Sequence, residues 1–408
     1  MSGARTGLRS LDDALADLLG FASVLPGLES VPTFDADGRV LAQDLLSELH
    51  VPPQDNSSMD GYALCCADLL QIPGVLPVRQ RIAAGSPAEP LATGSAARIF
   101  TGAPIPAGAD AVVMQEDCEL QGDIVQINVQ PRPGQWIRRA GEDVTRGATV
   151  LASGARLTPA SLGLAASIGM PELLVRRRPR VALFSTGDEL VMPGQVTPAD
   201  MKPGAIYNSN RFFLRALLLR LGCEVSDLGI VPDRFDATCE ALRAAAQSHD
   251  LVLTSGGVSV GEEDHIKPAV QSLGELSLWQ MAIKPGKPFA YGRVQDTHFI
   301  GLPGNPVSSY VTFMLLVRPF LLKLQGVTDL TTKSITAQAH FDWPRADRRR
   351  EFLRVRRNAA GGLELFANQS SGVLTSVVWA DGLVDNPPGQ TIAHGDAVRF
   401  IPFAELLR

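Results

Sequence analysis

Apolar residues in residues 8–24 recur with the spacing of a helix. They stand at positions 8, 11, 15, 18, 19 and 22, which places them on one face of a helix with 3.6 residues per turn. Ser10 precedes the first full turn and is a candidate N-cap. The pattern predicts an amphipathic helix in this segment.

Residues 27–176 show short apolar runs separated by turn signals. Proline and glycine recur there at short intervals, which is typical of short strands joined by turns. Strands are predicted at 109–117 and 123–129. Residues 157–170 are predicted as a short helix with Thr158 at the N-cap and a proline at its first position.

Strand patterns alternate with helical patterns from about residue 177 to residue 326. This alternation predicts βαβ units and a parallel sheet, with functional loops at the carboxyl ends of the strands. Strands are expected at 179–190, 223–231 and 250–257, and helices at 209–222, where Gly222 ends the helix, at 236–248 and at 306–324. After residue 327, short strands are expected at 334–340, 350–357, 363–369 and 396–403.

A glycine-containing loop follows the predicted strand at 250–257. Ser255, Gly256 and Gly257 let the backbone approach a phosphate closely, because glycine has no Cβ and tolerates positive φ. A helix starting near Glu262 would direct its amides toward the same place. One such loop is equally consistent with a plain turn.

A second loop of this kind spans residues 302–309. Gly304 and Asn305 turn the chain, Pro306 suits the first position of a helix, and Ser308 offers a donor. Two such loops in one α/β region indicate an anionic ligand.

Two lysines flank a proline–glycine turn in residues 282–292. The prolines stiffen the backbone around Lys284 and Lys287, so both ammonium groups are expected to be held in place. Two surface lysines on a hairpin are the alternative interpretation. Thr101 precedes a glycine at a further turn, where its hydroxyl would either bind a ligand or cap the turn.

Six carboxylates stand in turn contexts rich in glycine: Asp60, Glu142, Asp143, Asp188, Glu189 and Asp264. Such acids are frequently turn residues. Alternatively, they form the shell of a divalent cation, because Mg²⁺ takes one or two carboxylates together with phosphate oxygens. A phosphoanhydride with Mg²⁺ would use the glycine loops and lysines for its oxygens and the carboxylates for the metal.

Composition excludes several classes of protein. The formal net charge is −6, which argues against a nucleic-acid footprint. The five cysteines form no C-x-x-C pair, which fits a reducing compartment. No uninterrupted apolar run reaches the length of a membrane span. The arginine clusters at 176–178 and 348–350 are interpreted as solvated faces.

The motifs together resemble one family. "MDGYA", "TGAPIPAGADAVV", "RRAGEDV", "STGDEL", "YNSN", "TSGGVSVGEED", "AIKPGKPFAYG" and "GLPGNPVSS" occur in this order. Their order is similar to that of the molybdopterin molybdenumtransferase family, which includes MoeA and the gephyrin E domain. The resemblance covers roughly residues 8–405.

The resemblance implies a multidomain α/β plus β fold. Residues 1–26 with 177–326 would form a parallel-sheet α/β domain similar to the molybdopterin-binding fold. Residues 27–46 with 147–176 would form a small linking domain, and residues 47–146 a β-rich outlying domain. Residues 327–408 would form a C-terminal β-barrel, and two chains would associate as an elongated homodimer.

The implied reaction joins molybdate to adenylated molybdopterin. The phosphoanhydride is cleaved with Mg²⁺ as cofactor, AMP leaves, and molybdenum ends on the dithiolene. The catalytic positions carried over are Asp60, Thr101, Asp143, Glu189 and Asp264, of which Asp264 and Glu189 would hold the metal. Substrate-binding positions are Ser255, Gly256, Gly257, Asp233, Lys284, Lys287, Pro303, Gly304, Asn305, Pro306 and Ser308. Molybdate would meet Lys287, Ser308, Arg354 and Ser371.

Two other functions remain as alternatives. The first is the preceding adenylyltransferase step, although its related α/β fold lacks the "MDGYA" to "GED" region. The second is a gephyrin-like scaffold, which would carry a fused trimerising domain. The family further implies contacts with the upstream adenylyltransferase and with molybdoenzyme acceptors. A cytoplasmic location is expected, with neither nucleic acid nor membrane as partner.

Overall fold

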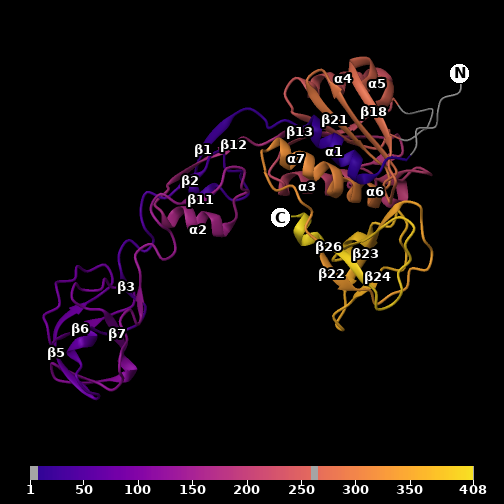
Figure 1. Cartoon of the computed structure of the whole chain (residues 1–408). Helices are drawn as coiled ribbons and strands as arrows, with labels where there is room; N and C mark the ends of the chain where they lie inside the picture. Colours follow the sequence, from indigo (N-terminus) through magenta and orange to yellow (C-terminus); the bar gives the residue numbers. More distant parts are fainter. Residues whose placement is uncertain (1–7, 259–264, 408) are drawn as a thin grey trace.

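A six-stranded sheet forms the centre of the larger end of the molecule in the computed structural model, which describes residues 8–258 and 265–407 (Figure 1). Its strand order is β16-β13-β17-β21-β20-β18. The strands are β13 (Arg180–Thr186), β16 (Glu224–Val231), β17 (Leu251–Ser255), β18 (Gly274–Gln280), β20 (Pro288–Val294) and β21 (Thr297–Leu302).

The sheet is mixed, whereas the sequence analysis predicted a parallel one. β16, β13, β17 and β21 pair in parallel, as the alternating pattern indicated. β18 and β20 are antiparallel to their neighbours. Only residues 295 and 296 separate β20 from β21, and so short a connection joins antiparallel strands, because a parallel pair needs a long crossover.

Helices cover both faces of this sheet. α4 (Phe235–Ala246) and α5 (Ile266–Leu273) share one apolar cluster with one face. α1 (Leu11–Phe21), α3 (Asn210–Arg220) and a long helix at 306–324 share another cluster with the opposite face. The helix expected to start near Glu262 begins at Ile266 instead, with His265 at its N-cap position, and Glu262 itself lies outside the described residues.

Local signals in the sequence correctly marked several helix ends. The Ser10 hydroxyl accepts a hydrogen bond from the amide of Asp13 at 3.1 Å, and Thr158 caps α2 (Pro159–Ser167) in the same way at 3.3 Å. Gly222 follows α3 with φ of +80°, a left-handed conformation that glycine adopts without strain. These three predictions are confirmed.

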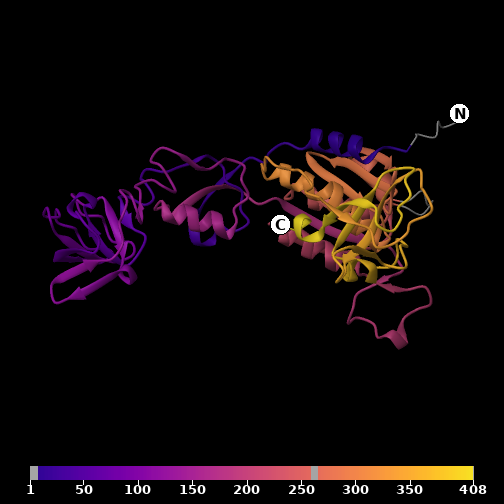
Figure 2. The same ribbon diagram turned by 60° about the horizontal axis from the view of Figure 1, so that its bottom comes forward.

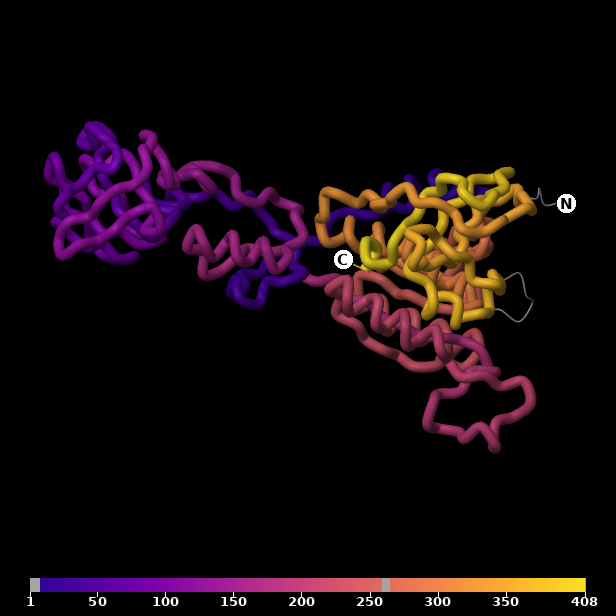
Figure 3. Tube along the Cα trace, turned by 90° about the horizontal axis from the view of Figure 1, so that it is seen from below, coloured from indigo at the N-terminus to yellow at the C-terminus, as the bar shows by residue number. Residues whose placement is uncertain are grey.

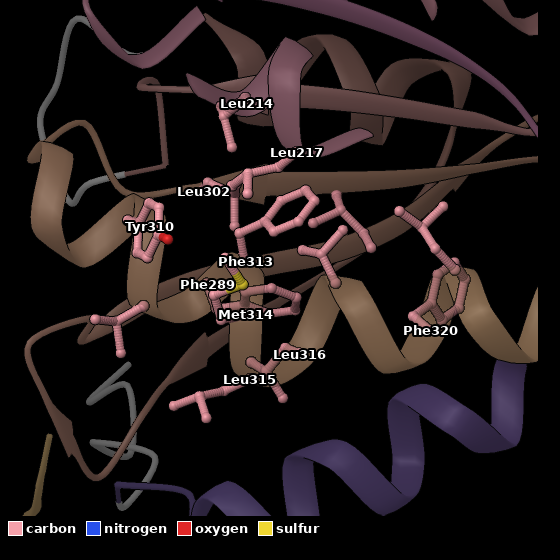
Figure 4. Packing of buried hydrophobic residues seen from close by; sticks show 14 of the residues in the cluster. Leu214, Leu217, Phe289, Leu302, Tyr310, Phe313, Met314, Leu315, Leu316 and Phe320 are labelled. Atoms are coloured by element: carbon pink, nitrogen blue, oxygen red, sulfur yellow. The ribbon is translucent and has the colours of Figure 1, made fainter. Parts of the chain in front are cut away.

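The helix at 306–324 is the buried centre of the α/β domain. It runs through α6 (Pro306–Thr312), a π-helical turn (Phe313–Val317) and α7 (Arg318–Leu324). Pro319 cannot donate a backbone hydrogen bond, which accounts for irregular bonding at this point. The helix is long and apolar enough to cross a membrane, but 94% of it is buried inside the protein. Figure 4 shows Phe313 and Met314 near Leu302 and Phe289, and Phe320 farther along the helix in the same core cluster.

α1 lies along the C-terminal part of this helix, although about three hundred residues separate the two in the chain (Figure 1). The Lys323 ammonium donates a hydrogen bond to the Leu19 carbonyl at the end of α1, at 2.6 Å. The amide of Leu25 donates to the Leu324 carbonyl at 2.9 Å. These bonds and the shared apolar cluster attach the N-terminal helix to the α/β domain.

The molecule is elongated because the chain leaves the α/β domain and returns to it (Figures 1, 2 and 3). β1 (Leu28–Pro32) runs out and β12 (Glu172–Arg176) runs back beside it, antiparallel. β2 (Leu45–Leu46) pairs with β11 (Thr149–Leu151) farther out, next to α2. We call these five elements the linking segment.

The part beyond the linking segment, from β3 to β10, is called the outer lobe. β3 (Asn56–Ser57) pairs with β10 (Ile137–Arg138) where the lobe begins. A sheet in the order β7-β4-β6-β5-β9-β8 makes up the rest. Its strands are β4 (Gly61–Leu64), β5 (Gly74–Ile82), β6 (Ala96–Ile99), β7 (Ala111–Met114), β8 (Cys118–Gln121) and β9 (Ile124–Ile127).

A third sheet, the C-terminal sheet, packs against the α/β domain. Its order is β19-β23-β25-β26-β22, with β24 beside β23. The strands are β19 (Ile283–Lys284), β22 (Ile335–Gln338), β23 (Arg350–Arg357), β24 (Leu363–Leu365), β25 (Gly382–Asn386) and β26 (Ala397–Pro402), with helices α8 (Thr375–Trp379) and α9 (Phe403–Leu406). Among the described residues this order has two free ends, so the closed β-barrel and the exact domain boundaries stay predictions.

The arginine clusters at 176–178 and 348–350 were interpreted as solvated faces, but each contains an arginine that forms ion pairs inside the protein. This corrects the interpretation. Arg177 makes a bidentate pair with Asp250, at 2.7 and 2.8 Å. Arg350 makes another with Asp385, at 2.6 and 2.7 Å, and also reaches Asp12 on α1. These pairs connect segments far apart in the sequence, so the local arginine run gave no sign of them.

A buried histidine is expected to make folding depend on pH. His298 is bonded to the Tyr291 hydroxyl at 2.9 Å, and burial lowers the pKa of His298 to about 4. The folded protein therefore favours the neutral imidazole, so this stabilisation is complete above pH 6.5 and is lost as pH falls toward 4. A difference of this size corresponds to about 3 kcal/mol.

The measurement is urea unfolding of wild type and His298→Gln between pH 7.5 and 4.5. We expect His298→Gln to lose less unfolding free energy than wild type over this range. His394→Gln, at an exposed position, is the matched control and is expected to follow wild type. Equal losses in wild type and His298→Gln would contradict the prediction.

Candidate functional site

The loops singled out in the sequence meet at the carboxyl edge of the parallel strands. Ser255, at the end of β17, lies opposite Ser185 on β13 and Leu302 on β21. The Gly256 amide donates to the Leu302 carbonyl at 3.1 Å. Asp233 follows β16 and Glu189 follows β13, so both stand at the same edge of the sheet. This arrangement is the one that α/β sheets use for ligands.

Asn210 joins the two glycine loops. Its amide group, at the start of α3, donates to the Ser255 hydroxyl and to the Gly304 carbonyl, both at 2.7 Å. Gly256 and Gly257 have φ of +96° and +66°, which explains the glycines in this loop. Pro306 occupies the first turn of α6 as predicted. Asn210 is the last residue of the "YNSN" motif, and no local signal in the sequence identified this bond.

Polar atoms are buried near this edge without a hydrogen-bond partner among the described residues. They include Ser185 Oγ, Asn208 Nδ2, Ser309 Oγ and Thr312 Oγ1. Buried polar groups are normally paired, so several such atoms in one region point to a polar ligand or ordered water. Thr312 is especially close to the lysine loop, because a Cβ on Gly286 would lie 2.5 Å from its hydroxyl.

The two lysines differ, contrary to the expectation that both are held. Lys284 donates to Glu351 Oε1 at 2.9 Å and lies 3.4 Å from Asp347 Oδ2. Lys287 is exposed, and no described residue forms an ion pair with it. The difference arises because Lys284 belongs to β19, which is paired with the C-terminal sheet, whereas Lys287 lies beyond the turn.

Arg354 carries a buried charge near the start of α6. Its guanidinium donates to the Ser376 hydroxyl and to the carbonyls of Phe352 and Ser370, at 3.2 to 3.3 Å. Among the described residues no carboxylate pairs with it, and burial lowers its pKa to about 10. The Val307 amide donates to the Ser371 carbonyl at 3.0 Å, which brings this loop to α6, where Ser308 lies.

A second group of predicted residues gathers at the base of the outer lobe. Asp60 Oδ1 accepts bonds from the amide and the hydroxyl of Thr101, both at 2.8 Å, and these bonds lower the pKa of Asp60. The Gly102 amide donates to the Ser57 carbonyl. The Asp143 amide donates to the Val51 carbonyl, on the segment that leads into the lobe. A cavity of about 410 Å³ adjoins them, lined by Asn56, Gly102 and neighbouring residues.

The five of these carboxylates that the structure describes do not form one shell within a chain, which corrects that expectation for them. Asp60, Glu142 and Asp143 lie at the outer lobe, whereas Asp188 and Glu189 lie at the α/β sheet (Figure 1). Sequence position could not reveal this, because the linking segment separates the two groups in space. Asp264 lies outside the described residues. Elsewhere, no three His, Cys, Asp or Glu side chains are grouped closely enough to hold a metal by themselves.

Three family models match successive parts of the chain. The MoeA N-terminal region (domain I and II) matches residues 9–169, and a probable molybdopterin binding domain matches residues 182–323. The MoeA C-terminal region (domain IV) matches residues 336–403. The three matches follow one another along the chain and cover most of it.

Similar proteins carry related names. A molybdopterin molybdenumtransferase from Haemophilus influenzae is 47% identical over 320 residues, covering 78% of this chain and 78% of that protein. Molybdopterin molybdenumtransferase 2 from Mycobacterium tuberculosis is 39% identical and covers 88% of this chain and 90% of its own. A crystal structure of a molybdopterin biosynthesis MoeA protein from Pyrococcus horikoshii OT3 superposes with a TM-score of 0.83 at 30% identity, covering 97% of this chain and 99% of that one.

Proposed function

Since the chain belongs to the molybdopterin molybdenumtransferase (MoeA) family, we propose that it inserts molybdate into adenylated molybdopterin and releases AMP. The insertion completes the molybdenum cofactor, and the enzyme is a transferase. The observation that carries this proposal is the meeting of two glycine loops, a lysine loop and a buried arginine around α6. Such a site suits a substrate with phosphates and a tetrahedral oxyanion.

The polar groups of the site are proposed to bind different parts of the two substrates. Backbone amides near Gly256 and Gly304 suit the phosphates, because glycine permits close approach. Lys284 and Lys287 would neutralise oxyanion charge that develops when the phosphoanhydride breaks. Arg354, Ser308 and Ser371 would receive molybdate. Arginine suits this role because its planar donors match a tetrahedral oxyanion with two hydrogen bonds.

Magnesium is the proposed cofactor, and a described carboxylate beside the strand ends supports this proposal. Glu189 offers a carboxylate at the strand ends: a Cβ on Gly187 would lie 2.6 Å from Glu189 Oε2, so this carboxylate folds back beside the loop. Mg²⁺ commonly takes one or two carboxylates and completes its shell with phosphate oxygens and water. Glu189 would hold the ion together with Asp264, and the ion would supply charge neutralisation at the phosphates.

The active assembly is proposed to be a homodimer in which two chains share each site. Asp60 and Thr101 lie in the outer lobe, which the linking segment separates from the α/β domain that contains Lys287 (Figure 1). A two-fold axis would bring the outer lobe of one chain to the α/β domain of the other, giving two equivalent sites. Asp143 and Asp233 would border the same shared site.

The setting of the protein completes the proposal. Its five cysteines are free thiols, which supports a reducing, cytoplasmic location. Its partners would be the upstream adenylyltransferase, which supplies the adenylated substrate, and the molybdoenzymes that accept the product.

The proposal is tested with purified protein, adenylated molybdopterin, molybdate and MgCl₂. We expect AMP and molybdenum-loaded cofactor to appear in equal amounts, and chelation of magnesium to slow both. Adenylated molybdopterin without molybdate is the control. Absence of AMP release from a folded protein would contradict the proposal.

A further inference from the structure

The ammonium group of Lys284 is attached to the C-terminal sheet through Glu351. β19 and β23 pair in parallel, with Lys284 opposite Glu351, and the Arg350 amide donates to the Ala282 carbonyl at 2.9 Å. Lys284 Nζ then donates to Glu351 Oε1 at 2.9 Å. Backbone pairing and side-chain contact therefore act together on this lysine.

Glu351 is itself fixed from the other side. The indole nitrogen of Trp343 donates to Glu351 Oε2 at 2.7 Å, and the Asn386 amide approaches the same oxygen at 3.5 Å. Asp347, the other acid near Lys284, is shared with Arg349, which donates to it at 2.9 Å and lowers its pKa. Glu351 is therefore the main counter-ion of Lys284.

Burial makes this pair hard to break. Glu351 is only 1% exposed, whereas the Lys284 side chain is 40% exposed. Moving the lysine away would leave a buried carboxylate without its counter-ion, which is strongly unfavourable. Lys284 therefore stays at Glu351 when an anion arrives and meets that anion from a fixed position.

The open side of Lys284 faces a cavity. The cavity has a volume of about 610 Å³ and is lined by Lys284, Trp343, Arg345 and Asp347, among others. An ammonium group has three donors: one bonds Glu351 Oε1, and a second lies toward Asp347, whose Oδ2 is 3.4 Å from Nζ in an ion pair. The remaining donor is available to a ligand, and Arg345 adds a second positive charge beside the opening.

We propose that Glu351 is a positioning residue, which fixes the Lys284 ammonium so that its free donor meets a tetrahedral oxyanion. The inference rests on the proposed function, because it assigns the oxyanion to that reaction. The oxyanion is either free molybdate or a phosphate of the adenylated substrate. Lys287 is exposed and has no ion pair with a described residue. Its side chain would therefore adjust its position to the bound ligand.

The test compares Glu351→Gln with a matched control. Glutamine keeps the shape and the Trp343 bond but removes the charge that holds Lys284. We expect the half-saturating concentration of one anionic substrate to rise about tenfold, the effect of losing one charge-assisted hydrogen bond. A rise for molybdate alone identifies molybdate as the anion at Lys284, and a rise for adenylated molybdopterin alone identifies its phosphate.

Asp385→Asn is the control, since Asp385 is equally buried in the same sheet but pairs with Arg350 and Arg399 instead of Lys284. It is expected to lower stability and to leave both half-saturating concentrations unchanged. In addition, Glu351→Gln should have no further effect on half-saturation in a Lys284→Ala background, because the two residues act as a unit. The inference would be overturned if Glu351→Gln and Asp385→Asn shifted the half-saturating concentrations equally. It would also be overturned if the effects of Glu351→Gln and Lys284→Ala were additive in the double variant.

If Glu351→Gln fails to fold, Asp347→Asn is a second variant that tests the same inference. Its more distant contact predicts a rise of about threefold in the same half-saturating concentration, and no rise would overturn the inference. Calorimetric titration of molybdate or inorganic phosphate into the protein without adenylated molybdopterin tests the Glu351 inference separately from the proposed reaction. If Glu351→Gln binds the anion more weakly than wild type but wild type releases no AMP, only the proposed reaction is contradicted. Unchanged binding and half-saturation in Glu351→Gln, with an active wild type, would contradict the Glu351 inference only.

Discussion

Asp60→Ala and Lys287→Ala, each expected to be inactive alone, are expected to regain about a quarter of wild-type insertion activity when they are unfolded and refolded together. Asp60 belongs to the outer lobe and Lys287 to the α/β domain, at opposite ends of the elongated molecule (Figure 1). If two chains share each site, a mixed dimer has one doubly damaged site and one intact site. Random assortment makes half of the dimers mixed, which gives the expected quarter.

The matched control is Asp60→Ala refolded with Thr101→Ala. Both changes lie in the outer lobe, where Thr101 donates two hydrogen bonds to Asp60. Every site in their mixed dimers would contain one damaged lobe, so the mixture should stay at the level of its parents. Wild type carried through the same procedure gives the refolding yield. A mixture of Asp60→Ala and Lys287→Ala that stays inactive would contradict the shared site.

Arg354→Met is expected to raise the half-saturating concentration of molybdate by about a hundredfold, the equivalent of about 3 kcal/mol. Arg354 is 1% exposed, and among the described residues it has hydrogen bonds only to neutral groups. A buried cation without a counter-ion lowers the stability of a protein. Such a destabilising residue is expected at a functional site, here one that binds an anion. Methionine has a similar volume and removes the charge.

Arg356→Met is the control for this change. Arg356 lies two residues farther along β23, is 45% exposed, and pairs with Glu364 at the surface. Its loss is expected to leave molybdate saturation unchanged. The measurement is AMP release against molybdate at saturating adenylated molybdopterin, with circular dichroism to verify folding. A folded Arg354→Met enzyme with wild-type molybdate saturation would show that the oxyanion binds elsewhere.

Local patterns in the sequence were sufficient for the elements that have local causes. Ser10 and Thr158 were recognised as caps because the preceding and following residues already define a helix end. β13 and β17 were recognised, to within a few residues at their ends, because their apolar runs stop at turns that contain glycine. The glycine loop at Ser255–Gly257, proposed to bind an anion, follows directly from the end of β17.

Contacts between distant segments could not be predicted in this way. Glu351 stands 67 residues from Lys284, and Asp385 stands 35 residues from Arg350, so neither ion pair leaves a periodic signal. The antiparallel direction of β18 depends on the register of the whole sheet. The separation of Asp60 from Glu189 depends on the path of the linking segment, which carries the chain away from the sheet and back.

The attachment of α1 to α7 affects the protein while it is being synthesised. α1 ends at Phe21, and the helix it packs against ends at Leu324, so the ribosome must add about three hundred residues before the contact can form. At about 5 to 20 residues per second this takes roughly 15 to 60 s. During that time α1 lacks its contact with α7, whereas the outer lobe, complete by Arg138, can already fold. We therefore expect a stage of synthesis in which the outer lobe has folded while part of the apolar face of α1 is still exposed, and such a surface favours aggregation unless a chaperone covers it.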